Sequence, residues 1–235
     1  MSGEGHQGEV PVVAIDGPGG AGKGTVSLLV AERLGWRLLD SGALYRLVAL
    51  QALEDGVDLN DEAVLARHAG TLDIEFAIAG REARVYLGGR DVTDAIRAEA
   101  CGAAASRIAM LPAVRTALVT RQRAFRRPPG LVADGRDMGS VIFPDARLKV
   151  FLTAGVDERA RRRYKQLIEK GIDVSLPALS REMADRDRRD AERSVAPLKP
   201  CQDARVLDTT GMTIPEVVST VLGWVNETYP DFMQI

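Results

Sequence analysis

The chain has 235 residues, a length that allows one large domain or a core with a small insert. Hydrophobic residues make up 46% and charged residues 27%, which excludes a wholly disordered protein. The net charge of -2 excludes a general attraction to nucleic acid or to an anionic membrane, so any anion-binding site must be local.

Residue types that bind zinc or form disulfides are scarce. The chain has two cysteines, Cys101 and Cys201, without a CxxC pair, and two histidines, so we expect neither a zinc site nor a disulfide framework. Residues 1–9 are polar and Gly-rich, which predicts a disordered tail. No apolar run reaches the ~18 residues of a membrane span. We therefore expect a cytoplasmic, reduced protein that binds neither nucleic acid nor membrane.

The first half of the chain alternates between strand and helix patterns. Residues 10–16 (VPVVAID) predict a buried strand of a parallel sheet. A helix from about Gly22 should stop at Gly35, which can adopt the left-handed conformation of a helix cap. A second strand is expected at 37–40 and a helix at 43–54. This order predicts right-handed crossovers and an α/β fold.

The pattern changes at about Gly70. Residues 72–79 and 83–87 alternate apolar with polar side chains, which is typical of antiparallel hairpins with one wet face. We interpret residues 70–106 as an inserted lobe, with residues 10–69 and 107–235 forming the core.

The rest of the chain returns to the α/β pattern. Helices are expected over 103–110 and, after Pro112, over 114–125, and short buried strands over 131–134, 148–152 and 205–208. The last helix should begin with a capping box of Thr213 and Glu216 and run to about 229. The prediction is an α/β fold with a parallel sheet flanked by helices and a small antiparallel insert.

A glycine-rich segment between the first strand and the first helix fits the GxxxxGK pattern of a phosphate-binding loop. Glycines let main-chain N–H groups wrap round a polyphosphate, the helix N-terminus favours negative charge, and Lys23 can reach the outer phosphates. The residues expected to bind ATP here are Gly17, Pro18, Gly19, Gly20, Ala21, Gly22, Lys23, Gly24 and Thr25.

The position after Lys23 usually holds a serine or threonine, but here it holds Gly24, and the hydroxyl comes one residue later at Thr25. Mg²⁺ should therefore be coordinated mostly by water. Thr25, Asp16 and Asp134 are the candidate ligands or water holders. For each carboxylate, a helix-capping or turn role is an equal alternative.

Five sequence blocks closely resemble bacterial cytidylate kinases, a family of P-loop nucleoside monophosphate kinases. They are IDGPGGAGKGT (15–25), LLDSGALYR (38–46), RQRAF (121–125), ADGRDMGSVIFPDA (133–146) and RDRRDAERSVAPL (186–198), and they span nearly the whole chain in order. The resemblance implies ATP-dependent phosphorylation of CMP and dCMP, with Mg²⁺ as cofactor, by a monomer.

The resemblance also implies roles on the acceptor side. Ser41, Arg46 and Arg136 would hold the CMP phosphate, Ser106, Arg115 and Asp137 would read the base, Asp190 would hold the ribose, and Arg186 and Arg193 would bridge the phosphates. Lys23, Arg136, Arg186 and Arg193 would be catalytic. The spacing i, i+4, i+7 puts Arg186, Asp190 and Arg193 on one helix face. For this helix face, the alternative is a solvent-exposed run of helical ion pairs. For Ser106, the alternative is an ordinary helix serine without a binding role.

A second basic stretch, at about residues 155–171, resembles the short helical lid on the ATP side of these kinases, and the insert resembles their acceptor-binding lobe. Because Arg161, Arg162 and Arg163 cannot all face one ligand, we select Arg159 and Arg163, which are four residues apart, as ATP contacts.

Two other functions fit parts of the sequence. Another small P-loop kinase could act on a different monophosphate or metabolite, and a nucleotide switch or ATP-binding module could share the loop. A GTP switch is disfavoured because the sequence has no NKxD-type guanine reader.

Overall fold

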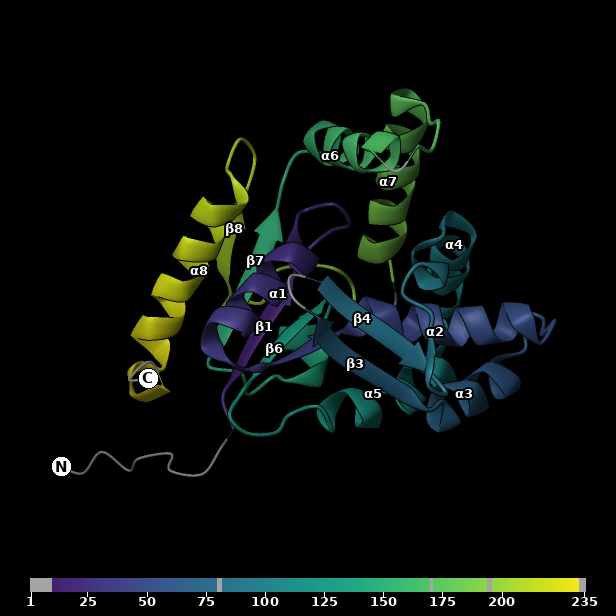
Figure 1. Ribbon diagram of the computed structural model, residues 1–235, viewed down its shortest axis with the longest axis horizontal. Helices are drawn as coiled ribbons and strands as arrows, with labels where there is room; N and C mark the ends of the chain where they lie inside the picture. Colours follow the sequence, from purple (N-terminus) through teal and green to yellow (C-terminus); the bar gives the residue numbers. More distant parts are fainter. Residues whose placement is uncertain (1–9, 80–81, 170, 194–195, 233–235) are drawn as a thin grey trace.

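The computed structural model describes residues 10–79, 82–169, 171–193 and 196–232, so the predicted tail at 1–9 lies outside the described residues. A parallel sheet with strand order β2-β6-β1-β7-β8 forms the centre (Figure 1). Its strands are β1 (Val12–Asp16), β2 (Arg37–Asp40), β6 (Leu131–Gly135), β7 (Leu148–Thr153) and β8 (Arg205–Asp208). All five predicted strands and the α/β fold are confirmed.

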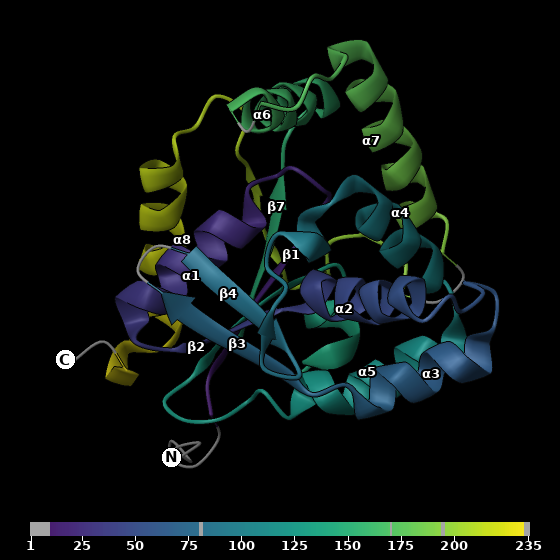
Figure 2. The same ribbon diagram turned by 45° about the vertical axis from the view of Figure 1, so that its right-hand side comes forward.

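Helices cover both faces of the sheet, and strand β1 shows why. Its side chains alternate: Val13 and Ile15 pack with α1 (Lys23–Leu34) and α8 (Ile214–Thr228), whereas Val12 and Ala14 belong to the cluster on the other face. That second cluster contains α2 (Ser41–Glu54), α3 (Glu62–Thr71), α4 (Glu99–Ile108) and α5 (Pro112–Arg123). Figure 2 shows the same layers from a second direction.

Two helix ends form as predicted, and a third has a cap that was not predicted. Gly35 ends α1 in the left-handed conformation, with φ of 62°. Thr213 and Glu216 form the full capping box at the start of α8. Asp40 caps α2 by accepting a hydrogen bond from the Ala43 N–H at 2.9 Å, which places the start of that helix at the carboxyl end of β2.

The predicted antiparallel hairpin is confirmed as a small sheet of β3 (Ile74–Ala79), β4 (Glu82–Leu87) and β5 (Arg90–Asp91). The predicted ends of the insert, Gly70 and Ser106, both fall inside helices, α3 and α4. Helix α4 starts at Glu99, four residues before the predicted start, and α3 was not predicted. Asp61 caps α3 through the Val64 N–H at 3.0 Å, a start signal that the sequence does carry.

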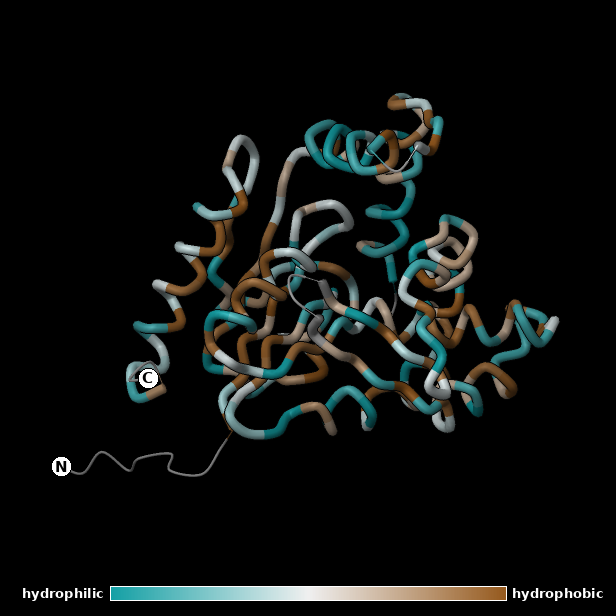
Figure 3. Tube along the Cα trace, in the orientation of Figure 1, coloured by the Kyte–Doolittle hydropathy of each residue, from teal (hydrophilic) through white to brown (hydrophobic). Residues whose placement is uncertain are grey.

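Two helices, α6 (Val156–Glu169) and α7 (Leu176–Ala191), extend beyond the carboxyl edge of the sheet (Figures 1 and 2). Both are mainly hydrophilic in Figure 3, unlike the strands beneath them. The predicted helix face of Arg186, Asp190 and Arg193 is wrong in one respect, because α7 ends at Ala191. The chain turns back there, and the Asp190 carbonyl accepts a hydrogen bond from the Leu198 N–H at 2.8 Å.

Short helical turns complete the described fold: η1 (Ala95–Arg97) precedes α4, η2 (Met138–Ile142) follows β6, and η3 (Pro230–Phe232) follows α8. No described helix is both long and apolar enough to cross a membrane.

Candidate active site

The glycine-rich loop runs from the end of β1 to the start of α1. Gly17 has φ of 149°, and a Cβ there would lie 1.9 Å from the Leu152 carbonyl oxygen, so the loop can approach β7 only with glycine at this position. Gly22, also in a left-handed conformation, precedes Lys23, and no side chain caps α1. The N–H groups of its first turn are therefore available to an anion.

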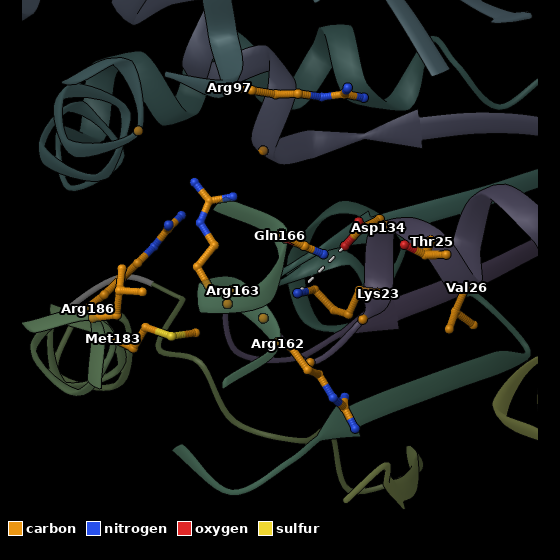
Figure 4. Close-up of a pocket in the computed structure, with 18 of the residues that line it drawn as sticks. Lys23, Thr25, Val26, Arg97, Asp134, Arg162, Arg163, Gln166, Met183 and Arg186 are labelled. Atoms are coloured by element: carbon orange, nitrogen blue, oxygen red, sulfur yellow. Dashed lines mark ion pairs between the residues drawn. The ribbon is translucent and has the colours of Figure 1, made fainter. Parts of the chain in front are cut away.

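Lys23 is buried at this helix start. Its ammonium group donates a hydrogen bond to the Pro18 carbonyl at 2.9 Å and lies 3.9 Å from an Asp134 carboxylate oxygen (Figure 4). Burial, with Arg136 adding, lowers the pKa of Lys23 to about 8, and burial raises the pKa of Asp134 to about 7. A phosphate that takes the place of the Pro18 carbonyl would give this ammonium a charged acceptor within hydrogen-bond distance.

The candidate magnesium residues differ in availability. Both carboxylate oxygens of Asp16 accept main-chain hydrogen bonds, from Met138 at 2.8 Å and Gly139 at 2.9 Å, and burial raises its pKa to about 6. Asp16 thus fills the turn role that the sequence left open. Thr25 and Asp134 line the cavity, and their hard oxygen atoms fit water-bound Mg²⁺. Within the described ranges, no cluster of three metal-ligating side chains occurs.

A cavity of about 1070 Å³ connects the loop with the helices above it. The loop, β6 and the start of α8 form one side, α6 and α7 another, and η1 with α4 the third. Basic side chains project into it from several elements (Figure 4). The predicted residues Lys23, Arg46, Arg136, Arg163 and Arg186 are among them. This arrangement suits a polyanion rather than an apolar ligand.

A smaller pocket of about 70 Å³ adjoins the cavity, and all nine residues predicted for CMP line it. At its base, Arg115 and Asp137 form a buried ion pair. The Ser106 hydroxyl is buried without a hydrogen-bond partner, which leaves it available to a ligand. Burial raises the pKa of Tyr45 to about 12, so this phenol packs in the wall as a neutral group. The nine residues are Ser41, Arg46, Ser106, Arg115, Arg136, Asp137, Arg186, Asp190 and Arg193.

Asp190 organises the basic groups beside this pocket. It accepts hydrogen bonds from Arg136 at 3.0 Å and Arg193 at 2.5 Å, so Arg193 joins the site from beyond the helix end. Burial acts to raise the pKa of Asp190, but Arg136 and Arg193 hold it below its usual value. Arg186 keeps a buried Nε without a partner, and burial lowers its pKa to about 10. It is thus placed to donate to a ligand.

The arginines of α6 that line the cavity differ from those predicted to contact ATP. Arg159 is buried behind the loop, where it donates to the Gly19 carbonyl at 2.9 Å and pairs with Asp187 at 2.5 Å, and it is not among the residues lining the cavity. Arg163 does line the cavity. Arg162, which we did not select, lines it too and donates to the Thr209 carbonyl at 2.7 Å. Its i, i+4 pairing with Glu158 on the same helix does not indicate which ligand or wall it faces.

Two acidic residues that sequence reasoning missed face the same cavity. Glu99 of α4 and Glu182 of α7 share a hydrogen bond between their carboxyl groups, which raises the pKa of Glu182 and lowers that of Glu99. Glu99 also lies 3.6 Å from Arg163 of α6. These contacts join α4 to α6 and α7, which come about fifty residues or more later in the chain, and no local pattern predicts them.

Comparison with known proteins gives a consistent result. The model of the family described as Cytidylate kinase matches residues 13–227. The cytidylate kinase of Pseudomonas aeruginosa is 60% identical over 217 residues, covering 92% of this chain and 95% of the relative. Those of Aeromonas salmonicida and Shewanella loihica are 55% and 54% identical, with 94% and 95% of this chain covered and 96% and 97% of each relative.

Proposed function

The chain belongs to the cytidylate kinase family and is a nucleoside monophosphate kinase that phosphorylates CMP and dCMP, and on this premise we propose which residues bind the two nucleotides and promote transfer. The donor is ATP, whose phosphates would lie on the loop of residues 17–25. Free N–H groups at the start of α1 and the buried ammonium of Lys23 support this placement.

The base of CMP would occupy the smaller pocket, with its phosphate toward the large cavity, where Arg46, Arg136 and Arg186 line both spaces. The observation that carries this assignment is the Arg115–Asp137 pair at its base, with the nine acceptor residues lining one pocket. Cytosine has an exocyclic amino group beside the ring acceptors N3 and O2, so a carboxylate can accept from the amine while a guanidinium donates to the ring. Uracil would put a carbonyl against the carboxylate, leaving two acceptors without a donor.

Transfer needs no nucleophile from the protein. An oxygen of the CMP phosphate, already ionised at neutral pH, attacks the γ-phosphorus of ATP, and the bond to the β,γ-bridging oxygen breaks to release ADP. Lys23, Arg136, Arg186 and Arg193 would stabilise the charge on the transferring group and hold the two phosphates in line. Their convergence from α1, β6 and the α7 region on adjoining pockets supports this role.

Mg²⁺ would be held through water by Thr25 and Asp134, while Asp16 would maintain the turn at residues 138–142. When bound, the ion neutralises phosphate charge. We further propose that residues 70–106 act as the acceptor lobe and residues 155–171 as the lid, which together exclude water. The working unit would be a cytoplasmic monomer.

An acceptor panel tests this proposal. ADP formation should be measured with ATP and CMP, dCMP, UMP or AMP at equal concentrations. We expect CMP and dCMP to be the best acceptors by kcat/KM. Equal or better turnover of AMP or UMP would refute the assignment of the Arg115–Asp137 pair as the base reader.

A further inference from the structure

Arg97 is the last residue of η1, the short turn between the small sheet and α4. It lines the large cavity, on the wall across from Lys23 and Thr25, with its side chain extended (Figure 4). Of the described residues in the proposed acceptor lobe, it is the one basic group that lines this cavity. The function proposed above gives it no role.

The guanidinium of Arg97 has little to hold it. Its one hydrogen bond, to the Ala83 carbonyl, is long at 3.4 Å, and in the described part of the chain no carboxylate pairs with it. Two other arginines of the cavity are paired with carboxylates: Arg136 with Asp190 at 3.0 Å and Arg163 with Glu99 at 3.6 Å. An arginine without a counter-charge on the wall of an anion-binding cavity is free to bind a phosphate.

Arg97 lines the large cavity but not the small acceptor pocket, and this difference indicates which phosphate it binds. The small acceptor pocket already contains Arg46, Arg115, Arg136, Arg186 and Arg193, and Arg97 does not line it. The cavity that it does line holds the glycine-rich loop. Across this cavity Arg97 lies opposite Lys23 and Thr25 (Figure 4), where the phosphate chain of the donor is proposed to bind.

A hydrogen bond next to Arg97 in the chain involves an arginine of the proposed acceptor site. The guanidinium of Arg46 donates a hydrogen bond to the carbonyl of Ile96 at 2.6 Å, and Ile96 is the neighbour of Arg97 in the chain. Arg46 lines the acceptor pocket. A phosphate that fixes Arg46 also fixes this carbonyl, and with it the turn that carries Arg97.

We propose that Arg97 is a catalytic residue of the acceptor lobe that binds the phosphate chain of ATP once CMP holds Arg46. The proposal rests on the two nucleotide sites assigned above. In this proposal Arg97 binds the ATP phosphates only when CMP is bound, so the donor site is complete only in the ternary complex. Phosphoryl transfer to water is therefore disfavoured when CMP is absent.

Calorimetric binding of a non-hydrolysable ATP analogue, with and without saturating CMP, tests this role. In the unmodified enzyme, CMP should increase the affinity for the ATP analogue. In Arg97→Gln, the affinity in the presence of CMP should fall by about tenfold or more while the affinity without CMP stays the same, and kcat should fall by a similar factor. Arg97→Lys should recover part of both.

Arg107→Gln is the matched control. Arg107 is an exposed arginine of α4 that contacts Asn60 at 3.4 Å and does not line the cavity, so its loss should leave the affinity for the analogue unchanged both with and without CMP. Equal weakening in Arg97→Gln with and without CMP, or a lower melting temperature with weaker CMP binding, would assign Arg97 to hairpin support and overturn the proposal. An unchanged affinity of Arg97→Gln for the ATP analogue in the presence of CMP would also overturn the proposal.

A failure of the proposed function is separate, because it would appear in the unmodified enzyme. If CMP neither binds nor accepts phosphate there, the site assignment fails before any variant is made. If CMP is phosphorylated and Arg97→Gln retains full coupling between the two ligands, Arg97 alone is excluded.

Discussion

The two proposed nucleotide sites are built from different parts of the chain. The proposed donor site is mainly backbone: the glycine-rich loop and the open N-terminus of α1, with the buried side chains of Lys23 and Asp134 beside them. The acceptor site is mainly side chain, with the ion pairs Arg115–Asp137 and Arg136–Asp190 set in its walls.

The difference follows from what each site must recognise. Phosphates look alike on every nucleotide, so N–H groups and a positive helix end suffice for them. A cytosine must be distinguished from other bases, which requires donors and acceptors in a fixed pattern. Changes on the donor side should therefore reduce catalysis with every acceptor, and changes on the acceptor side should alter the choice between acceptors.

The largest effect should come from Lys23→Met. Loss of the ammonium removes charge stabilisation at the transferring phosphoryl group, so kcat should fall by about a hundredfold to a thousandfold with CMP, dCMP and UMP alike. Coupled ADP formation measures it, and CMP binding by calorimetry should be unchanged. A change in acceptor preference would show that the two sites are not separable in this way.

Asp137→Asn should have the next largest effect, on selectivity. The amide can donate to a uracil carbonyl, so the CMP/UMP ratio of kcat/KM should fall by about fivefold to a hundredfold, the equivalent of ~1 to 3 kcal/mol, while the KM for ATP stays the same. The surface variant Asp55→Asn is the control. An unaltered ratio would remove Asp137 from base recognition.

The affinity for ATP should depend on pH in the alkaline range more strongly than the affinity for CMP. Because burial lowers the pKa of Lys23 to about 8, its ammonium is present below that pH and is lost as the pH rises through it. ATP affinity should weaken by about tenfold for each pH unit above 8. Calorimetry from pH 7 to pH 9.5 measures this, and in Lys23→Met the dependence should disappear. A CMP affinity that falls equally over this range would contradict the separation.

Ser106→Ala should have the smallest effect. The hydroxyl is buried without a partner, so its removal breaks no hydrogen bond in the empty protein and the melting temperature should not fall. The KM for CMP should rise by about twofold to tenfold if the base or sugar uses this hydroxyl. An unchanged KM would make Ser106 an ordinary helix serine, the alternative that the sequence leaves open.

Features set by local chemistry could be predicted from the sequence. The loop, the five strands, the cap at Gly35 and the capping box at Thr213 depend on short segments, and all four form as expected. The family resemblance named nine acceptor residues that the fold gathers round one pocket.

Features that depend on contacts between distant segments could not be predicted. Helical spacing could not show that Arg159 is held by Gly19 and Asp187, or that Arg162 faces the cavity instead. Arg193 enters the site because the chain turns back after Ala191. The Glu99–Glu182 contact requires α4 and α7 to meet, which no local window of sequence encodes.

The position of β1 also bears on how the protein is made. Among the described strands it comes earliest in the chain, yet it lies between β6 and β7, whose residues come more than a hundred positions later. During synthesis β1 can pair on both of its edges only after β7 has been made. Such long-range pairing is slow, so the apolar segment VVAID stays unpaired for most of the synthesis of the chain.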